Sequence, residues 1–316
     1  MIAGITASVI ALSIKTSNNI AQAESKPKVV ASHNVICDLV DTIAVETIEL
    51  TCLMDADQDP HTYRPTPGDR KAIEEAQLIL YGGYQLEPQI TELFANAETP
   101  KVALYEVVTE PIMVEHESES KQPEAGEKVP KPELEADPHV WHNVENTVKM
   151  VEAIQSIFLQ VNPTAAEQYL VNSVSLTEQL WQLDAWIKDQ VATIPEGQKF
   201  LVTTHDSLNY YVKAYDLDDY QTLQGLSAES SPTASQVRDL SQKVKAAGVT
   251  TIFAESTKSD RVIRNVAKAA GVKLSEQPLY ADGLGAAENY TEMMSHNTCA
   301  IVDGLGGECE PFKPQK

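Results

Sequence analysis

Apolar and polar positions follow two periods along the chain, one typical of strands and the other of helices. Residues 27–45 begin with an apolar β-branched run and continue as an amphipathic helix, and residues 46–54 supply a second strand. Thr66, followed by a proline and then by Asp69, has the form of a helix N-terminus. Another apolar run at 78–84 follows that helix. Strands and helices in alternation predict a parallel sheet flanked by helices.

The same alternation returns in the second half of the chain. We expect strands at 199–205, 249–256 and 272–280, and helices at 206–215, 231–248 and 259–271. The two halves share this architecture without a repeated sequence. Because the chain has 316 residues and a single core usually takes about 100–200, we expect two α/β domains.

One long helical pattern, from residue 163 to residue 194, separates the two halves. Its apolar positions recur at three- or four-residue steps without glycine or internal proline, at Tyr169, Leu176, Leu180, Leu183, Ile187 and Val191. Such a helix spans roughly 45 Å at about 1.5 Å per residue, more than the width of a small domain. We therefore predict a helical spine between the domains. A coiled coil is the alternative, although the stripe lacks a strict seven-residue repeat.

Residues 115–136 interrupt the pattern, because they are rich in Glu, Lys, Pro and Ser and almost free of apolar residues. This composition is typical of a mobile, solvated loop. The chain as a whole has 42% hydrophobic residues, as a globular protein does, and 46 acidic residues against 24 basic ones give a net charge of −22. That charge disfavours binding to nucleic acid and to anionic membrane surfaces. It is suited to a cationic ligand, and the alternative is that it only keeps the protein soluble.

The first residues resemble a secretory signal peptide. An apolar run of about 13 residues from Ile2 to Ile14 is too short to span a bilayer, and a small-x-small pattern, Ala21-Gln22-Ala23, follows it. No basic residue precedes the run, which departs from the usual pattern. We interpret residues 1–23 as the signal, with no cysteine near the cleavage point to carry a lipid.

Export would place the four cysteines of the chain in an oxidising compartment, where an even number indicates disulfides. Three pairings are possible, and the simplest joins sequence neighbours, Cys37 with Cys52 and Cys299 with Cys309. A thiolate metal site is the alternative, but no C-x-x-C spacing supports it.

Three histidines follow expected strands or enter expected helices: His61 in "DPHTYRPTPGD", His139 in "DPHVWHNV" and His205 in "LVTTHDSL". Asp282, in "PLYADGLG", is also placed after a strand. Ligands of open α/β sheets collect beyond the carboxyl ends of strands. Three imidazoles and a carboxylate form a four-coordinate set that suits Zn²⁺, although each histidine taken alone is more typical of a surface or capping residue.

These motifs resemble the zinc- and manganese-type solute-binding proteins of ABC importers, the ZnuA-like group. "DPHTYRPTPGD" is similar to the family pattern DPHxYEPTPxD, "DPHVWHNV" to DPHxWLDP, and "TTHDSLNYYVKAY" to THDxxxYFxKAY, while "LYADGLG" is a weaker match. The resemblance covers nearly the whole mature chain. It implies two lobes, each a small, mostly parallel α/β sheet flanked by helices, joined by one long rigid helix. The expected lobes are residues 24–162 and 195–316.

The resemblance also implies that His61, His139, His205 and Asp282 are metal ligands in a cleft between the lobes. Arg64 stands where the family has glutamate. His142 stands where the family has leucine, and we interpret it as an outer or outward-facing residue. The family places a His- and acid-rich insertion at 115–136, but this chain has only one histidine there, so we expect weak metal attraction or none.

The third ligand position indicates the metal. In similar proteins a histidine in this position goes with zinc and a glutamate with manganese, and this chain has His205. Imidazole-rich sets also favour Zn²⁺ over Mn²⁺ on chemical grounds. The expected function is periplasmic capture of Zn²⁺ by a monomer and delivery to a membrane permease, with a Mn²⁺-binding protein of the same transporter class as the alternative. Ligand imidazoles must be neutral, so affinity should fall as the pH drops through about 6.5.

Two other classes of function fit the sequence less well. A zinc hydrolase would need an open coordination position and a base, and the sequence has neither HExxH nor GxSxG. His205, Asp206 and Ser207 are consecutive, so their side chains point in different directions and cannot form a relay. An adhesin, a role assigned to some relatives, has no supporting repeat or aromatic stripe. We therefore expect a carrier and not an enzyme.

Overall fold

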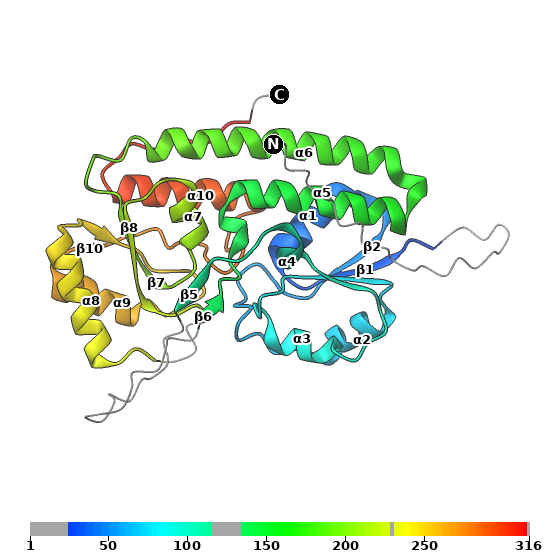
Figure 1. Ribbon diagram of the computed structural model, residues 1–316, viewed down its shortest axis with the longest axis horizontal. Coiled ribbons are helices and arrows are strands. Elements are labelled where there is room, and N and C mark those ends of the chain that lie inside the picture. The colour runs from blue at the N-terminus through cyan, green and yellow to red at the C-terminus, as the bar shows by residue number, and fades with distance from the viewer. Residues whose placement is uncertain (1–24, 116–133, 228–230, 315–316) are drawn as a thin grey trace, which may run out of the picture.

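The computed structural model of the chain describes residues 25–115, 134–227 and 231–314, and its first lobe is built on a parallel sheet (Figure 1). The strand order is β2-β1-β3-β4, with the strands β1 (Lys28–Ala31), β2 (Glu49–Cys52), β3 (Leu78–Tyr81) and β4 (Lys101–Ala103). Each strand is followed by a helix, in the order α1 (Asn34–Ala44), α2 (Pro67–Glu75), α3 (Pro88–Phe94) and α4 (Leu104–Val108). The predicted alternation of strand and helix is confirmed for this lobe.

Strand β1 is buried on both faces. Val29 and Ala31 pack into the core to which α1 contributes, whereas Val30 packs with Ile79 and Phe94 on the opposite side. Successive side chains of a strand point to opposite faces, so a central parallel strand covered by helices on both sides is apolar throughout. This is the reason for the continuous apolar run in the sequence.

The second lobe repeats the parallel arrangement with shorter strands. Strands β7 (Phe200–His205) and β8 (Asp219–Gln224) pair in parallel, as do β9 (Thr251–Ile252) and β10 (Lys273–Leu274). The helices of this lobe are α7 (Asn209–Ala214), α8 (Ala234–Ala247), α9 (Arg261–Ala270) and α10 (Tyr290–Gly304). The Phe253 amide donates to the Val202 carbonyl at 2.9 Å and so joins the two strand pairs.

The predicted strands at 249–256 and 272–280 were too long. Regular pairing ends at Leu274, because Ser275 Oγ accepts from the Gln277 amide and donates to its carbonyl, which makes a turn. Pro278, which has no amide hydrogen to give to a ladder, follows. Pairing returns only as an isolated parallel bridge between Glu255 and Leu279.

Helix α6 (Ala166–Val191) is the predicted spine. It has 26 residues, begins after a short 3-10 turn at Pro163–Ala165, and ends three residues before the predicted end. It lies along α5 (Val144–Val161), α1 and α10, and so contacts both lobes (Figure 1). One hydrophobic cluster runs from Val29 in the first lobe through Leu180 to Ile301 in the second. A continuous core of this kind makes the helix a rigid connection.

The predicted loop at 115–136 is partly a hairpin. Strands β5 (Met113–Glu115) and β6 (Leu134–Ala136) pair in antiparallel fashion, so both ends of the segment are strands and not loop. Backbone pairing at these ends does not require apolar side chains, which is why composition alone gave the wrong boundaries. Residues 116–133, with the predicted solvated loop, and residues 1–23, the predicted signal, lie outside the described part of the chain.

Both disulfides join sequence neighbours. Cys37 of α1 pairs with Cys52 of β2, with Cα atoms 5.7 Å apart, and Cys299 of α10 pairs with Cys309, with Cα atoms 5.1 Å apart. The simplest of the three predicted pairings is therefore confirmed. Among the described residues, no helix is both long and apolar enough to cross a membrane.

Replacing Leu180 with alanine should destabilise the protein by about 2–5 kcal/mol, because Leu180 is fully buried on the inner side of α6 and truncation leaves a cavity. Val174→Ala on the same helix is the control, since Val174 is 56% exposed, and it should change the free energy by less than about 0.5 kcal/mol. Urea unfolding of both variants measures the difference. Equal losses would contradict the role of α6 as the core of the spine.

Candidate metal centre

Four buried side chains from four separate segments meet at one point. They are His61, His139, His205 and Asp282, and one potential ligand atom from each lies within 4.8 Å of all the others. The Nε2 atoms of His61, His139 and His205 lie 3.5, 3.5 and 3.0 Å from Oδ1 of Asp282. The structure thus brings together all four residues that the sequence singled out.

His61 is presented by a braced loop between β2 and α2. Its backbone amide donates to Oδ1 of Asp59 at 3.0 Å. Helix α2 begins with the predicted capping box, in which Thr66 and Asp69 exchange side-chain and backbone hydrogen bonds. The Tyr63 hydroxyl lies 2.9 Å from two acceptors, Oδ2 of Asp69 and the Leu53 carbonyl oxygen, and its single proton can serve either. The loop is therefore fixed at both ends of the histidine.

His139 is held by Asp137, two residues before it. Oδ1 of Asp137 accepts from both the backbone amide and Nδ1 of His139, each at 2.9 Å. Asn209 donates to Oδ2 of the same carboxylate at 3.0 Å. Because Nδ1 is engaged, Nε2 is the nitrogen that faces the other imidazoles, and a carboxylate behind a histidine is a common arrangement at metal sites.

His205, the last residue of β7, has the same kind of support from Glu255. One carboxylate oxygen of Glu255 accepts from the backbone amides of Thr204 and His205, both at 3.0 Å. The other oxygen is hydrogen-bonded to Nδ1 of His205. The ring is therefore fixed, with Nε2 pointing to the group.

The two oxygens of Asp282 have different surroundings. Oδ2 accepts from the Thr257 hydroxyl at 2.5 Å and lies 3.1 Å from Nζ of Lys258. Oδ1 of Asp282 and Nε2 of His205 are both buried and lie 3.0 Å apart, but without the geometry of a hydrogen bond. Neither atom has a hydrogen-bond partner among the described residues. Buried polar atoms left in this way are costly unless a ligand satisfies them.

Two further buried histidines hold the backbone that carries Asp282. Nε2 of His33 bonds to the Asp282 carbonyl at 2.9 Å, while its Nδ1 bonds to the Tyr105 hydroxyl. Nε2 of His142 bonds to the Ala281 carbonyl at 2.8 Å. The structure therefore places His142 behind the group and not facing outward, and it places Arg64 on the surface.

Several supporting residues were missed by the sequence analysis: His33, Asp59, Asp137, Glu255, Thr257 and Lys258. Asp59 and Asp137 could have been found from the sequence, because each is the first residue of an Asp-Pro-His triplet. Each accepts a hydrogen bond from the backbone amide of the histidine in its triplet. Glu255 could not, since it lies 50 residues from His205.

The electrostatics of the group favour a positive charge at its centre. Burial lowers the pKa of His205, but the charges of Glu255 and Asp282 outweigh it and raise that pKa to about 10. Burial also opposes charge on His139, yet the hydrogen bond to Asp137 and the nearby carboxylate of Asp282 leave its pKa raised. Despite burial, the charge of His205 holds the pKa of Asp282 well below its usual range. Burial lowers the pKa of His61.

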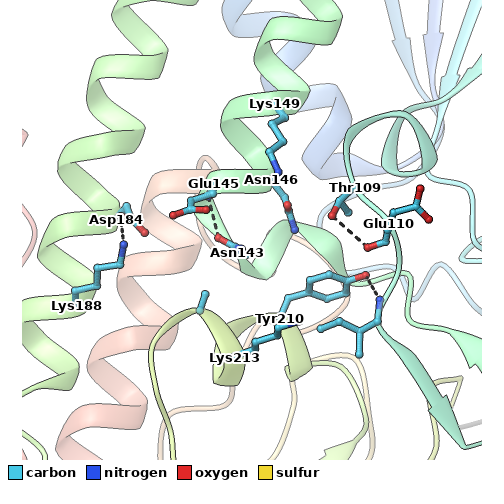
Figure 2. Close-up of a pocket in the computed structure, with 12 residues that line it drawn as sticks. Thr109, Glu110, Asn143, Glu145, Asn146, Lys149, Asp184, Lys188, Tyr210 and Lys213 are labelled. Atoms are coloured by element: carbon cyan, nitrogen blue, oxygen red, sulfur yellow. Dashed lines mark hydrogen bonds and ion pairs between the residues drawn. The ribbon is translucent and has the colours of Figure 1, made fainter. Parts of the chain in front are cut away.

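Two cavities lie near the group. One of about 400 Å³ has His61 in its wall together with the base of the β5–β6 hairpin. The other, of about 340 Å³, lies between α5, α6 and α7 and is lined by lysines and carboxylates, including the pair Asp184 and Lys188 (Figure 2). It shares Tyr210 with the site, whose hydroxyl donates to the Asp137 carbonyl at 3.1 Å. Its lining contains no histidine and several lysines, which disfavours a divalent cation there.

Comparison with known proteins identifies related chains over nearly the full length. The family model described as "ZnuA: Zinc-uptake complex component A periplasmic" matches residues 29–304. The manganese-binding lipoprotein MntA of Halalkalibacterium halodurans is 29% identical over 282 residues, 88% of this chain and 88% of that protein. The zinc-binding protein TroA of Treponema pallidum is 30% identical over 294 residues, 90% of this chain and 91% of that protein.

The fold also matches a solved structure. The periplasmic zinc-binding protein TroA from Treponema pallidum superposes with a TM-score of 0.77 at 28% identity, covering 89% of this chain and 99% of that one. The named relatives are divided between zinc and manganese. Sequence likeness therefore supports a metal-binding protein without choosing the ion.

The buried histidines behind the site should make the protein sensitive to acid. Burial lowers the pKa of His142 to about 3, whereas an unfolded histidine has a pKa of about 6.5. As the pH falls below 6.5, the unfolded chain takes up a proton that the folded protein does not, so stability is lost by up to about 1.4 kcal/mol per pH unit. His142→Gln keeps a donor for the Ala281 carbonyl and should reduce this slope between pH 6 and 4. Urea unfolding of the chelated proteins measures it, and an unchanged slope would contradict the prediction.

Proposed function

The chain belongs to the ZnuA family of periplasmic metal-uptake components, and from this premise we propose that it captures Zn²⁺ and delivers the ion to an ABC-type membrane permease. The observation that carries the proposal is the convergence of three imidazole Nε2 atoms and one carboxylate oxygen in a buried group. Four nitrogen and oxygen donors of this kind match the tetrahedral coordination that zinc prefers.

The proposed ligands are His61 and His139 from the first lobe and His205 and Asp282 from the second. Zn²⁺ bound by all four would join the lobes and neutralise the carboxylate. The edges of the lobes already meet beside the site, where the Gly285 amide donates to the Ala56 carbonyl at 3.0 Å. Release to the permease then requires these contacts and the metal bonds to break together. We propose that the protein acts as a monomer, exported by residues 1–23.

A closed set of four protein ligands serves capture better than catalysis. A catalytic zinc site keeps one position open for water, with a base beside it. Glu255, the carboxylate next to His205, is engaged with that histidine and with two backbone amides. It is therefore occupied as a positioning residue. Family membership points in the same direction, because the family is one of solute-binding proteins.

Manganese is the second candidate, favoured by the likeness to a manganese-binding lipoprotein. Mn²⁺ prefers oxygen donors and a higher coordination number than the group offers. The four donors include only one carboxylate. We therefore propose Zn²⁺ as the transported ion.

Removing a ligand should weaken zinc binding far more than removing a histidine behind the site. His205→Ala should lower the affinity for Zn²⁺ by more than about 100-fold, whereas His142→Gln should stay within the roughly 10- to 100-fold range of an outer partner. Competition titration of chelated protein with Zn²⁺ and Mn²⁺ measures both, and wild type should prefer Zn²⁺. The reverse order of the two variants would show that the ligand assignment is wrong.

Zinc binding should release a proton near neutral pH. Because the pKa of His205 is about 10 without metal, this imidazole is protonated at pH 7 and must lose its proton to bind. Calorimetric titration at pH 7 in buffers of different ionisation enthalpy should give at least about one proton released per ion, since the pKa of His139 is raised as well. Glu255→Gln, which removes a carboxylate that raises this pKa, should release less. Proton-free binding by wild type would contradict the assignment of His205.

A further inference from the structure

The two oxygens of Asp282 are unequal. Oδ2 is engaged by two donors from one loop, the Thr257 hydroxyl at 2.5 Å and the Lys258 ammonium at 3.1 Å. Oδ1 faces the three imidazoles and has no hydrogen-bond partner among the described residues. The carboxylate thus offers one oxygen to the centre of the group and keeps the other bound to protein.

We propose that Thr257 and Lys258 restrict Asp282 to binding a metal through one oxygen and thereby select Zn²⁺ against Mn²⁺. The inference rests on the proposed function and assigns its specificity to two positioning residues outside the ligand set. With one oxygen from Asp282 the site provides four donors, which Zn²⁺ accepts as a complete tetrahedron. Mn²⁺ favours more oxygen ligands. Oδ2 of Asp282 could provide one more if it were free to turn toward the metal.

The position of Lys258 makes the restraint firm. Its side chain is only 10% exposed, and Nζ also contacts Oδ2 of Asp59 at 2.5 Å. Asp59 in turn accepts the backbone amide of His61. The lysine therefore lies between two carboxylates, one in each lobe, and turning Oδ2 toward a metal would leave a buried ammonium with only one of its partners.

The segment from Glu255 to Lys258 reaches three of the four proposed ligands. Glu255 fixes the His205 ring, Thr257 and Lys258 hold Asp282, and Lys258 joins the Asp59 turn that presents His61. The Ser256 amide is itself tied to the Leu279 carbonyl at 2.9 Å. One short loop of the second lobe thus supports three of the proposed ligands, and supporting contacts of this kind tune a metal site.

A positive charge near the ion has a second effect that must be separated from the first. Lys258 repels any divalent cation, so its removal should strengthen the binding of Zn²⁺ and Mn²⁺ by similar factors. Release of Oδ2 should instead help Mn²⁺ more than Zn²⁺. The ratio of the two affinities, and not either affinity alone, reports the restraint.

The test uses Thr257→Val, Lys258→Gln and the double variant. The preference for Zn²⁺ over Mn²⁺, measured by competition titration, should fall by about tenfold or more in the double variant, the scale of lost outer partners at metal sites. Thr257→Val alone should shift the ratio in the same direction, and it removes no charge. Lys188→Gln is the matched control, because Lys188 pairs with Asp184 on the same helix and not with Asp282, and it should leave the ratio unchanged.

Co²⁺ gives a reading that does not depend on affinity. Four-coordinate Co²⁺ has intense visible absorption bands, which weaken when the coordination number rises. Wild type and Lys188→Gln should show the intense bands, and the double variant should show weaker ones. Circular dichroism of each variant confirms that the fold is intact.

Some results would overturn the inference. Equal changes in the two affinities, with an unchanged Co²⁺ spectrum in a folded double variant, would show that Lys258 acts by charge alone. A wild type that prefers Mn²⁺ would instead refute the proposed function. In that case a change of the affinity ratio and of the Co²⁺ spectrum in the double variant would still support the restraint on Asp282. No change in either would contradict it.

Discussion

The structure is organised around a buried negative charge that needs a cation. Asp282 is fully buried, and its Oδ1 lies among three imidazole nitrogens without a hydrogen-bond partner in the described residues. Burying a carboxylate in this way is costly unless positive charge lies beside it. Lys258 lies beside Oδ2, and a proton on His205, whose pKa is raised to about 10, places positive charge beside Oδ1. Under the proposed function the bound ion would replace that proton, so binding would exchange a proton for a divalent cation.

The fold provides what this exchange needs, which is a fixed set of donors from distant parts of the chain. His205 ends β7 and His61 follows β2, so both lie beyond the carboxyl ends of parallel strands, where the loops of an α/β sheet converge. Helix α6 contacts helices of both lobes within one continuous core. This core holds the two lobes in a fixed position relative to each other. The loops that carry the proposed ligands are therefore kept at a fixed separation.

Local features of the site could be predicted from the sequence, and long-range ones could not. Short motifs contain the capping box at Thr66 and each of the four converging residues. Each motif specifies its own turn or strand end. Lys258 and Asp59 meet across 199 residues, and no periodicity or motif links them. The same limit explains the strands at 249–256 and 272–280, whose length depends on the partner available at each position and not on apolar pattern alone.

Under the proposed function, the choice of metal depends on where the carboxylates lie. Asp137 is hydrogen-bonded to Nδ1 of His139, and Glu255 to Nδ1 of His205. Each carboxylate orients its imidazole and increases the basicity of the ring without contacting the centre of the group. A chain that placed such a carboxylate at the centre would offer more oxygen and suit manganese better. Here only Asp282 reaches the centre, and its second oxygen is held by Thr257 and Lys258. Within the proposed function, the arrangement of the carboxylates about the centre therefore limits the number of oxygen donors that the ion meets, while the lobes and the spine only bring the donors together.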